Sequence, residues 1–187
     1  MPIADLGYMN VNRKIRAFLA IEVSRGLAPI SLFERVDSEH QLRPVKTGNL
    51  HLTLEFFGDI EPVYVHKIEI AMQSVSFREF SLEFSGLGAF PGPDRGRVLF
   101  IRVEDQPELD RIRNLILQKL GRETGNSFVP HVTIGRAKQP FNLNPLIDEF
   151  RDISFESKVN QVTLFASELT ANGPVYRELE KITSISE

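Results

Sequence analysis

The chain has 187 residues, of which 42% are hydrophobic and 25% are charged, and its formal net charge is −3 with a pI near 5.9. These values are typical of a folded protein with a sizeable core, and they provide no overall basic field that would hold a long nucleic acid. The absence of cysteine excludes disulfides, thiolate catalysis and cysteine-ligated zinc.

No apolar run approaches the roughly 18 residues that a membrane-spanning helix needs, so we expect no membrane partner. The segment Met1–Lys14 lacks the basic and apolar regions of a signal peptide, which favours a cytoplasmic protein. We expect residues 1–14 to form a disordered or extended N-terminal segment. Residues 15–187 are expected to form a single bilobal domain.

The first half of the chain is expected to alternate between strands and helices. Short apolar runs bounded by Gly, Pro or Ser indicate strands, and apolar residues at helical spacing after a proline indicate helices. The expected elements are a strand at 15–23, a short helix within 27–36 with Pro29 in its first turn, a strand at 51–57 closed by Gly58 and Asp59, a helix from Pro62, a strand at 80–86, a loop at 86–96 and a strand at 97–103.

The second half repeats this pattern, which suggests two similar lobes. The expected elements are a helix from Pro107 that ends at Gly121, a strand at 131–135, a short helix N-capped by Asn144, strands at 152–159 and 160–169, and an element at 175–185 that is either strand or helix. The short connections favour antiparallel sheets with helices packed on one side, which is an α+β fold.

A His-x-Thr-x tetrad occurs twice. The first copy begins at His51 and the second at His131, and each lies on a predicted strand. Residues i and i+2 of a strand share a face, so His51 projects with Thr53 and His131 projects with Thr133. If the lobes face each other, a cleft between them holds two imidazoles and two hydroxyls.

This set of groups suits the chemistry of a phosphodiester. Two imidazoles can serve as proton donor and proton acceptor near neutral pH. Two hydroxyls can donate hydrogen bonds to the non-bridging oxygens of one phosphate. An in-line displacement at phosphorus needs both proton transfer and hydrogen bonds to the phosphate, and it requires no metal. The alternative, a zinc site, ordinarily needs a third histidine or a carboxylate beside the two histidines.

Residues that follow the tetrads allow two interpretations each. In a regular strand Arg136 would face away from the second histidine, but a bulge at Gly135 would turn it toward the phosphate. The alternative for Arg136 is an ion pair with a surface carboxylate. Phe57 shares the parity of the first histidine and would offer a base a stacking face. Core packing is nevertheless the preferred interpretation of both Phe56 and Phe57.

The stretches HLTLEFFG and PHVTIGR resemble the paired signatures of the two-histidine phosphoesterases, and in particular the LigT-like RNA 2′,3′-cyclic phosphodiesterases, also called 2′-5′ RNA ligases. Together with IRAFLAIEV, FSGLGAFPGPDRGRVLFIRV and VTLFASELTANGPVYREL, the resemblance covers nearly all of residues 15–182. It implies a bilobal α+β fold with two antiparallel sheets, outer helices and a central cleft. It also implies metal-independent hydrolysis of RNA 2′,3′-cyclic phosphate ends to a 2′-phosphate, without a cofactor.

The resemblance also implies roles for the site residues. His51 is expected to be the proton donor and His131 the proton acceptor, while Thr53, Thr133 and Arg136 contact the phosphate. Reversal of the reaction would join RNA ends through a 2′-5′ linkage. The expected partners are RNA 3′ ends or nucleoside 2′,3′-cyclic phosphates, and we expect a monomer.

Two alternative functions stay open at this point. The same chemistry could act on another cyclic phosphate or on a 2′-5′ oligonucleotide, because selectivity depends on loops that the sequence pattern does not describe. A non-catalytic nucleotide-binding module would keep the same fold. Loss of one histidine would favour that module, and both histidines are present.

Overall fold

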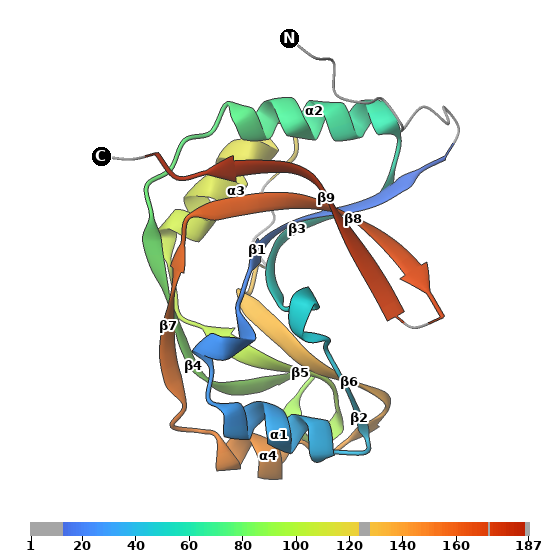
Figure 1. Ribbon diagram of the computed structural model, residues 1–187, viewed down its shortest axis with the longest axis vertical. Coiled ribbons are helices and arrows are strands. Elements are labelled where there is room, and N and C mark those ends of the chain that lie inside the picture. Colours follow the sequence, from blue (N-terminus) through green and yellow to red (C-terminus); the bar gives the residue numbers. More distant parts are fainter. Residues whose placement is uncertain (1–12, 124–127, 172, 186–187) are drawn as a thin grey trace.

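Nine strands in the described part of the chain form one antiparallel sheet (Figure 1). Eight of them follow the order β7-β4-β5-β6-β3-β1-β8-β9, and β2 pairs with β6 beside this path. The computed structural model describes residues 13–123, 128–171 and 173–185, so the prediction for residues 1–12 lies outside it. The strands are β1 (Ile15–Glu22), β2 (Leu42–Pro44), β3 (His51–Ile60), β4 (Phe80–Phe90), β5 (Gly96–Val103), β6 (His131–Phe141), β7 (Ser154–Val159), β8 (Gln161–Thr170) and β9 (Gly173–Thr183). The helices are α1 (Ile30–Ser38), α2 (Pro62–Gln73), α3 (Pro107–Lys119) and α4 (Asn144–Glu149).

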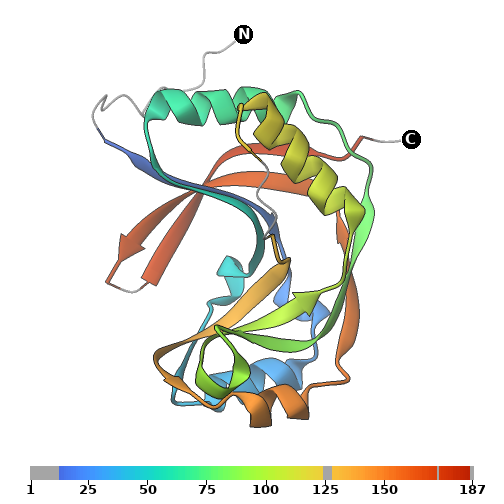
Figure 2. The same ribbon diagram turned by 180° about the vertical axis from the view of Figure 1, so that it is seen from behind.

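The sheet divides into two lobes, because β3 and β6 share a single ladder pair, Leu52 with Val132. One lobe contains β3, β1, β8 and β9 with α2 and α3 packed on it, and the other contains β2 and β4–β7 with α1 and α4. Figures 1 and 2 show the two helix pairs at opposite ends of the molecule. The α+β prediction is confirmed, and the two expected sheets are joined into one path where the lobes meet. The lobes are not sequence halves, since the C-terminal β8 and β9 complete the lobe that begins with β1.

The two long helices form as their sequences predict. Both α2 and α3 begin with proline, whose missing N–H costs nothing in a first helical turn. The side chain of Gln106 caps α3 by accepting a hydrogen bond from the Glu108 N–H. Gly121, at φ 66°, follows the end of α3, in the left-handed conformation that favours glycine. None of the described helices is long and apolar enough to cross a membrane.

Several predicted boundaries were wrong. β4 continues to Phe90, where a loop was expected, because residues 87–90 pair with β5 after an irregularity at Gly86. β3 likewise continues through Gly58 to Ile60. Asn144 is the first residue of α4 and not its cap, and Pro29 immediately precedes α1. The short strand β2 was not predicted, and the ambiguous C-terminal element is strand β9.

Candidate active site

The two tetrads lie side by side where the lobes meet. Leu52 and Val132, the second residues of the tetrads, are opposite each other in the antiparallel ladder and are fully buried. Their flanking residues project to the other face, so His51 comes beside Thr133 and Thr53 beside His131. We call the face that carries these four side chains the histidine face. The structure therefore brings all four predicted residues together.

Both imidazoles are held in the same way. Nδ1 of His51 lies 2.6 Å from the carbonyl oxygen of Asn49, and Nδ1 of His131 lies 2.8 Å from that of Val129. A carbonyl only accepts, so Nδ1 of each neutral ring carries the proton and donates it. Nε2 of each ring is left to exchange protons, and no described residue forms a hydrogen bond with it. The carbonyl two residues before each histidine thus fixes the tautomer of that imidazole ring.

Aromatic rings frame His51 in the first lobe. The ring of His51 lies 4.9 Å from that of Phe18 on β1 and 5.3 Å from that of Tyr176 on β9, measured between centroids. Phe18 and Tyr176 also contact each other, and both pack with the buried Phe165. Burial in this apolar setting raises the pKa of Tyr176, while the charge of Arg136 acts in the opposite direction.

The second lobe repeats the arrangement around His131. Its ring lies 5.1 Å from Phe90 on β4 and 5.2 Å from Phe100 on β5, and these two phenylalanines stack at 4.4 Å. Gly88 makes room for this packing, since a Cβ there would lie 2.4 Å from Cζ of Phe100. The rings restrict each imidazole to one orientation on the histidine face.

The electrostatics around His51 favour its neutral form. Burial lowers the pKa of His51 below its ordinary value of 6.5, and the positive charges of Arg136 and His131 lower it further. The hydrogen bond to Asn49 acts in the opposite direction but is outweighed. The influence of Arg136 and His131, both from the other lobe, means that these three groups are close in space.

A bulge turns Arg136 onto the histidine face. Against β5, the register of β6 shifts between Thr133 and Gly135, which leaves Ile134 as an extra residue. Ile134 is buried, and a side chain at position 135 would also meet the buried side, at Leu42. The next side chain, that of Arg136, therefore projects with Thr133. This is the bulge that the sequence suggested at Gly135.

The first tetrad carries a bulge at the same place, which corrects a prediction. The register of β3 against β1 shifts after Thr53 and leaves Leu54 as the extra residue. The parity of the strand changes there, so Phe56 lies opposite Phe18 on the histidine face and is 47% exposed. Phe57, expected on that face by simple alternation, is 9% exposed and belongs to the core. The core interpretation therefore holds for Phe57 alone.

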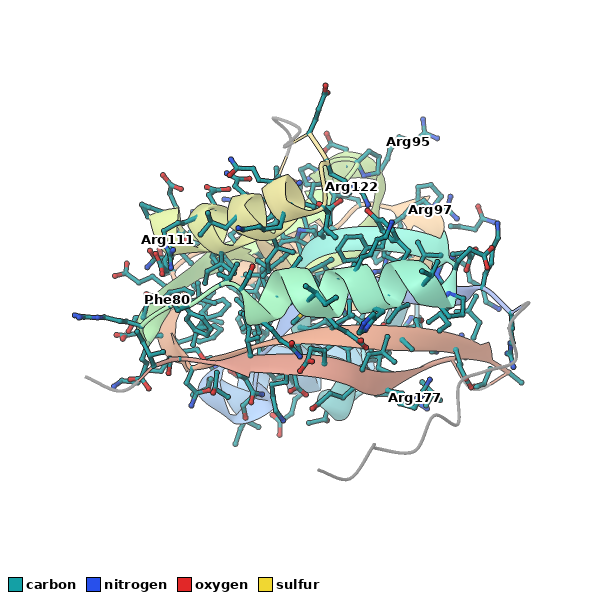
Figure 3. All side chains as sticks on the ribbon, turned by 90° about the horizontal axis from the view of Figure 1, so that it is seen from above. Phe80, Arg95, Arg97, Arg111, Arg122 and Arg177 are labelled. Atoms are coloured by element: carbon teal, nitrogen blue, oxygen red, sulfur yellow. The ribbon has the colours of Figure 1, made fainter. Side chains whose placement is uncertain are left out.

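A buried arginine holds the bulge of the first tetrad. Nε of Arg113, on α3, donates to the carbonyl of Leu54 at 2.9 Å, and its Nη2 lies 2.8 Å from Oε2 of Glu55. Arg122 binds the other oxygen of Glu55 at 3.3 Å. Figure 3 shows Arg111 and Arg122 near opposite ends of α3. Glu55 is thereby kept on the helix side, away from the histidine face.

The bulge of the second tetrad is held by backbone alone. The N–H of Val45, just after β2, donates to the carbonyl of Ile134 at 2.9 Å. In both lobes the extra residue of the bulge thus finds a donor outside the sheet ladder. This satisfies a buried carbonyl that the irregular pairing would otherwise leave without a partner.

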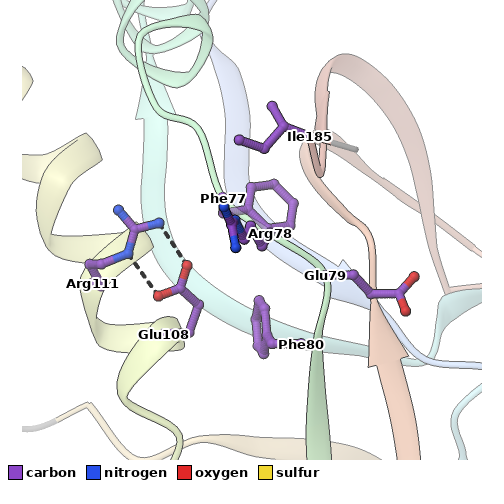
Figure 4. Close-up of a pocket in the computed structure, with 7 residues that line it drawn as sticks. All are labelled: Phe77, Arg78, Glu79, Phe80, Glu108, Arg111 and Ile185. Atoms are coloured by element: carbon purple, nitrogen blue, oxygen red, sulfur yellow. Dashed lines mark hydrogen bonds and ion pairs between the residues drawn. The ribbon is translucent and has the colours of Figure 1, made fainter. Parts of the chain in front are cut away.

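The described surface also has hollows that contain none of the tetrad residues. One, of about 400 Å³, is lined by Phe77, Arg78, Glu79, Phe80, Glu108, Arg111 and Ile185 (Figure 4). Its Arg111 is neutralised by Glu108 at 2.6 Å. Within residues 13–123, 128–171 and 173–185, no group of three or more His, Cys, Asp or Glu side chains is arranged to hold a metal ion. The chemistry-bearing side chains gather on the histidine face instead.

Sequence reasoning missed the aromatic residues of this site. Phe18 and Phe100 were assigned to strands but not to the histidine face, although their pairing partners lie there. Tyr176 fell in the element whose type was ambiguous. Phe90 fell in the expected loop. Only the strand register, which depends on tertiary pairing, could assign them.

Known proteins resemble this chain over most of its length. The sequence profile described as the 2′-5′ RNA ligase superfamily matches residues 27–170. An RNA 2′,3′-cyclic phosphodiesterase of Methanothermobacter thermautotrophicus is 34% identical over 179 residues, covering 89% of this chain and 97% of that protein. One of Aeropyrum pernix is 36% identical over 154 residues, covering 78% and 88%.

Solved structures share the fold. The apo form of Escherichia coli LigT superposes with a TM-score of 0.68 at 22% identity, covering 93% of this chain and 99% of that one. TT0787 of Thermus thermophilus gives a TM-score of 0.67 at 23% identity, covering 90% and 97%.

Proposed function

The chain belongs to the 2′-5′ RNA ligase superfamily, and from this premise we propose that it hydrolyses 2′,3′-cyclic phosphate ends of RNA to 2′-phosphates. The observation that carries the proposal is the pairing of Leu52 with Val132, which sets two imidazoles and two hydroxyls on one face. The curated relatives named as RNA 2′,3′-cyclic phosphodiesterases support the choice of substrate. Because both tetrads come from one chain, we also propose that a monomer suffices.

The phosphate lies between the tetrads in this proposal. The hydroxyls of Thr53 and Thr133 project from the histidine face beside the imidazoles, where they can donate hydrogen bonds to non-bridging oxygens. Arg136, turned onto the same face, stabilises the charge that develops as water adds to phosphorus. In this proposal, these hydrogen-bond donors hold the phosphate without a metal.

The imidazoles move the protons. Nε2 of one histidine accepts a proton from water as its oxygen attacks phosphorus. Nε2 of the other donates a proton to O3′ as the P–O3′ bond breaks, which leaves a 3′-hydroxyl and a 2′-phosphate. Such in-line geometry needs the two groups on opposite sides of phosphorus. The antiparallel pairing, which sets each histidine beside the threonine of the other tetrad, supports this part of the proposal.

The two histidines are distinguished by their surroundings. The resemblance assigned His51 as donor and His131 as acceptor. We propose the same roles here. In the unliganded protein, burial and two neighbouring cations lower the pKa of His51. The negative charge of a bound phosphate acts in the opposite direction and favours the protonated ring that a proton donor needs.

The same pair can serve ligation. An RNA 5′-hydroxyl in place of water would attack the cyclic phosphate and form a 2′-5′ linkage, with identical proton transfers. Water is far more abundant than RNA ends, so we propose hydrolysis as the main reaction.

Turnover of a nucleoside 2′,3′-cyclic phosphate in excess EDTA tests the proposal, with the product identified by phosphorus NMR. The expected product is the 2′-phosphate, formed by the wild-type protein and not by a His131→Ala preparation purified in parallel. A 3′-phosphate product, or equal turnover in both preparations, would contradict it.

A further inference from the structure

Two arginines lie side by side on neighbouring strands of the second lobe. Arg43 of β2 and Arg136 of β6 are directly opposite in the antiparallel ladder, so their side chains share a face. The adjacent pair, Leu42 and Ala137, is buried on the other side of the two strands. Both arginines are exposed. Arg43 therefore extends the histidine face beyond Arg136.

This pair of cations has no counter-charge in the described part of the chain. Neither Arg43 nor Arg136 takes part in an ion pair or hydrogen bond with a described residue, whereas Arg35, Arg111 and Arg113 all bind carboxylates. Like charges directly opposite in a ladder destabilise it. The chain carries a net charge of −3, so carboxylates are not scarce. An anion bound between the two guanidinium groups would relieve the repulsion.

The position of Arg43 separates it from the terminal phosphate. Arg136 lies three residues beyond Thr133 along β6, a span of about 10 Å at most. Arg43 lies one strand farther out, on the side of β6 that faces away from β5. A phosphate held by the tetrads is thus reached first by Arg136. Arg43 is placed for a second anion next to it.

We propose that Arg43 binds the phosphodiester that precedes the terminal cyclic phosphate of an RNA strand, with Arg136 lying between the two phosphates. This rests on the proposed function, because a 3′-terminal cyclic phosphate is followed upstream by further phosphodiesters. A guanidinium binds two oxygens of one phosphodiester in a planar fork. The preferred substrate is then an RNA end with at least one internal phosphodiester, and a cyclic mononucleotide lacks the group that Arg43 recognises.

The experiment compares kcat/KM for adenosine 2′,3′-cyclic phosphate and for the dinucleotide ApA ending in a 2′,3′-cyclic phosphate. The wild-type protein is expected to favour the dinucleotide by about tenfold, as one charge-assisted contact provides. Arg43→Gln should abolish most of this preference and leave the mononucleotide rate within about twofold. Arg43→Lys keeps the charge without the planar fork, so its preference for the dinucleotide should lie between those of the wild-type protein and Arg43→Gln. Arg151→Gln is the matched control, since Arg151, which follows α4, pairs with Asp148 of that helix.

The outcomes separate this inference from the proposed function. No turnover of either substrate by the wild-type protein would remove the proposed function itself. Turnover of both without preference for the dinucleotide would overturn only the inference. Equal losses on both substrates in Arg43→Gln would overturn it as well, because Arg43 would then act at the terminal phosphate or on the fold.

Discussion

Leu52 and Val132 are opposite each other at the one ladder pair between β3 and β6, and this contact aligns the two tetrads in antiparallel fashion. The relationship is local, yet it joins strands from the two lobes. It makes the site approximately two-fold symmetric, from the Nδ1–carbonyl bonds of His51 and His131 to the bulges that follow each threonine.

The symmetry predicts comparable roles for the two threonines. Thr53→Val and Thr133→Val should each lower kcat/KM by roughly 10- to 100-fold, because each removes one hydrogen bond to a charged oxygen. Steady-state kinetics on a cyclic nucleotide measures this. Thr163→Val is the control, since Oγ1 of Thr163 is buried without a hydrogen-bond partner among the described residues. A wild-type rate in either tetrad variant would remove that hydroxyl from the site.

The pKa of His51 is predicted to lie below 6.5 and to rise in Arg136→Gln, since removal of a neighbouring cation favours the imidazolium. Proton NMR titration, with the His51 resonance assigned from its loss in His51→Gln, measures both. A pKa that does not move in Arg136→Gln would contradict the placement of Arg136 beside His51.

The same shift predicts how stability depends on pH. The unfolded chain binds a proton more readily at His51 than the folded protein does. The contribution of His51 to the free energy of unfolding is therefore fully present above pH 6.5, and it is lost as the pH falls toward the lowered pKa of the folded protein. Denaturant unfolding between about pH 5 and 7 should show a shallower dependence for His51→Gln. An unchanged slope would mean that the ring is not shielded from water.

The bulge of the first tetrad should depend on Arg113. Arg113→Met leaves the Leu54 carbonyl without its donor and Glu55 with one cation fewer, so we expect a loss of about 3 kcal/mol in the free energy of unfolding. Arg111→Met, on the same helix, breaks a surface ion pair and should cost under about 1 kcal/mol. Equal losses in the two variants would show that the contacts of Arg113 with Leu54 and Glu55 stabilise the fold no more than a surface ion pair does.

Gly88 is predicted to matter for the orientation of His131. In Gly88→Ala the new Cβ displaces Phe100, whose ring packs on His131, so both stability and kcat/KM should fall. In Gly96→Ala the new Cβ meets Leu143 at 2.3 Å. Leu143 is not among the residues whose rings pack on the histidines, so this variant should reduce stability alone. Assays at a temperature where both variants are folded distinguish them. Equal kcat/KM in the two variants would argue against a positioning role of Phe100.

The tetrads were predictable because alternation places His51 with Thr53 and His131 with Thr133 whatever their partners are. The bulges were predictable only in part. Gly135 signalled one, since a glycine inside a strand often marks a bulge. The other follows Thr53 without a glycine and is held by Arg113, far away in sequence, so simple alternation chose Phe57 in place of Phe56.

The sequence predicted the fold class but not the order in which the strands pair. Local patterns identified the strands, but β8 and β9 return to the lobe of β1, and such pairing is set by long-range packing. Strand β2 was missed because only one of its three residues, Leu42, is buried. That short strand nevertheless carries Arg43 to its place beside Arg136.

The central claim is that His51 and His131 act as one acid–base unit, and kinetics of His51→Ala, His131→Ala and the double variant on one cyclic nucleotide test it most directly. Each single variant should lose roughly 10²- to 10⁴-fold in kcat/KM with an unchanged circular dichroism spectrum. The double variant should lose little more than the worse single variant, because a unit that has lost one member gains nothing from the other. Near wild-type activity in either single variant, or strictly multiplicative losses in the double, would contradict the account.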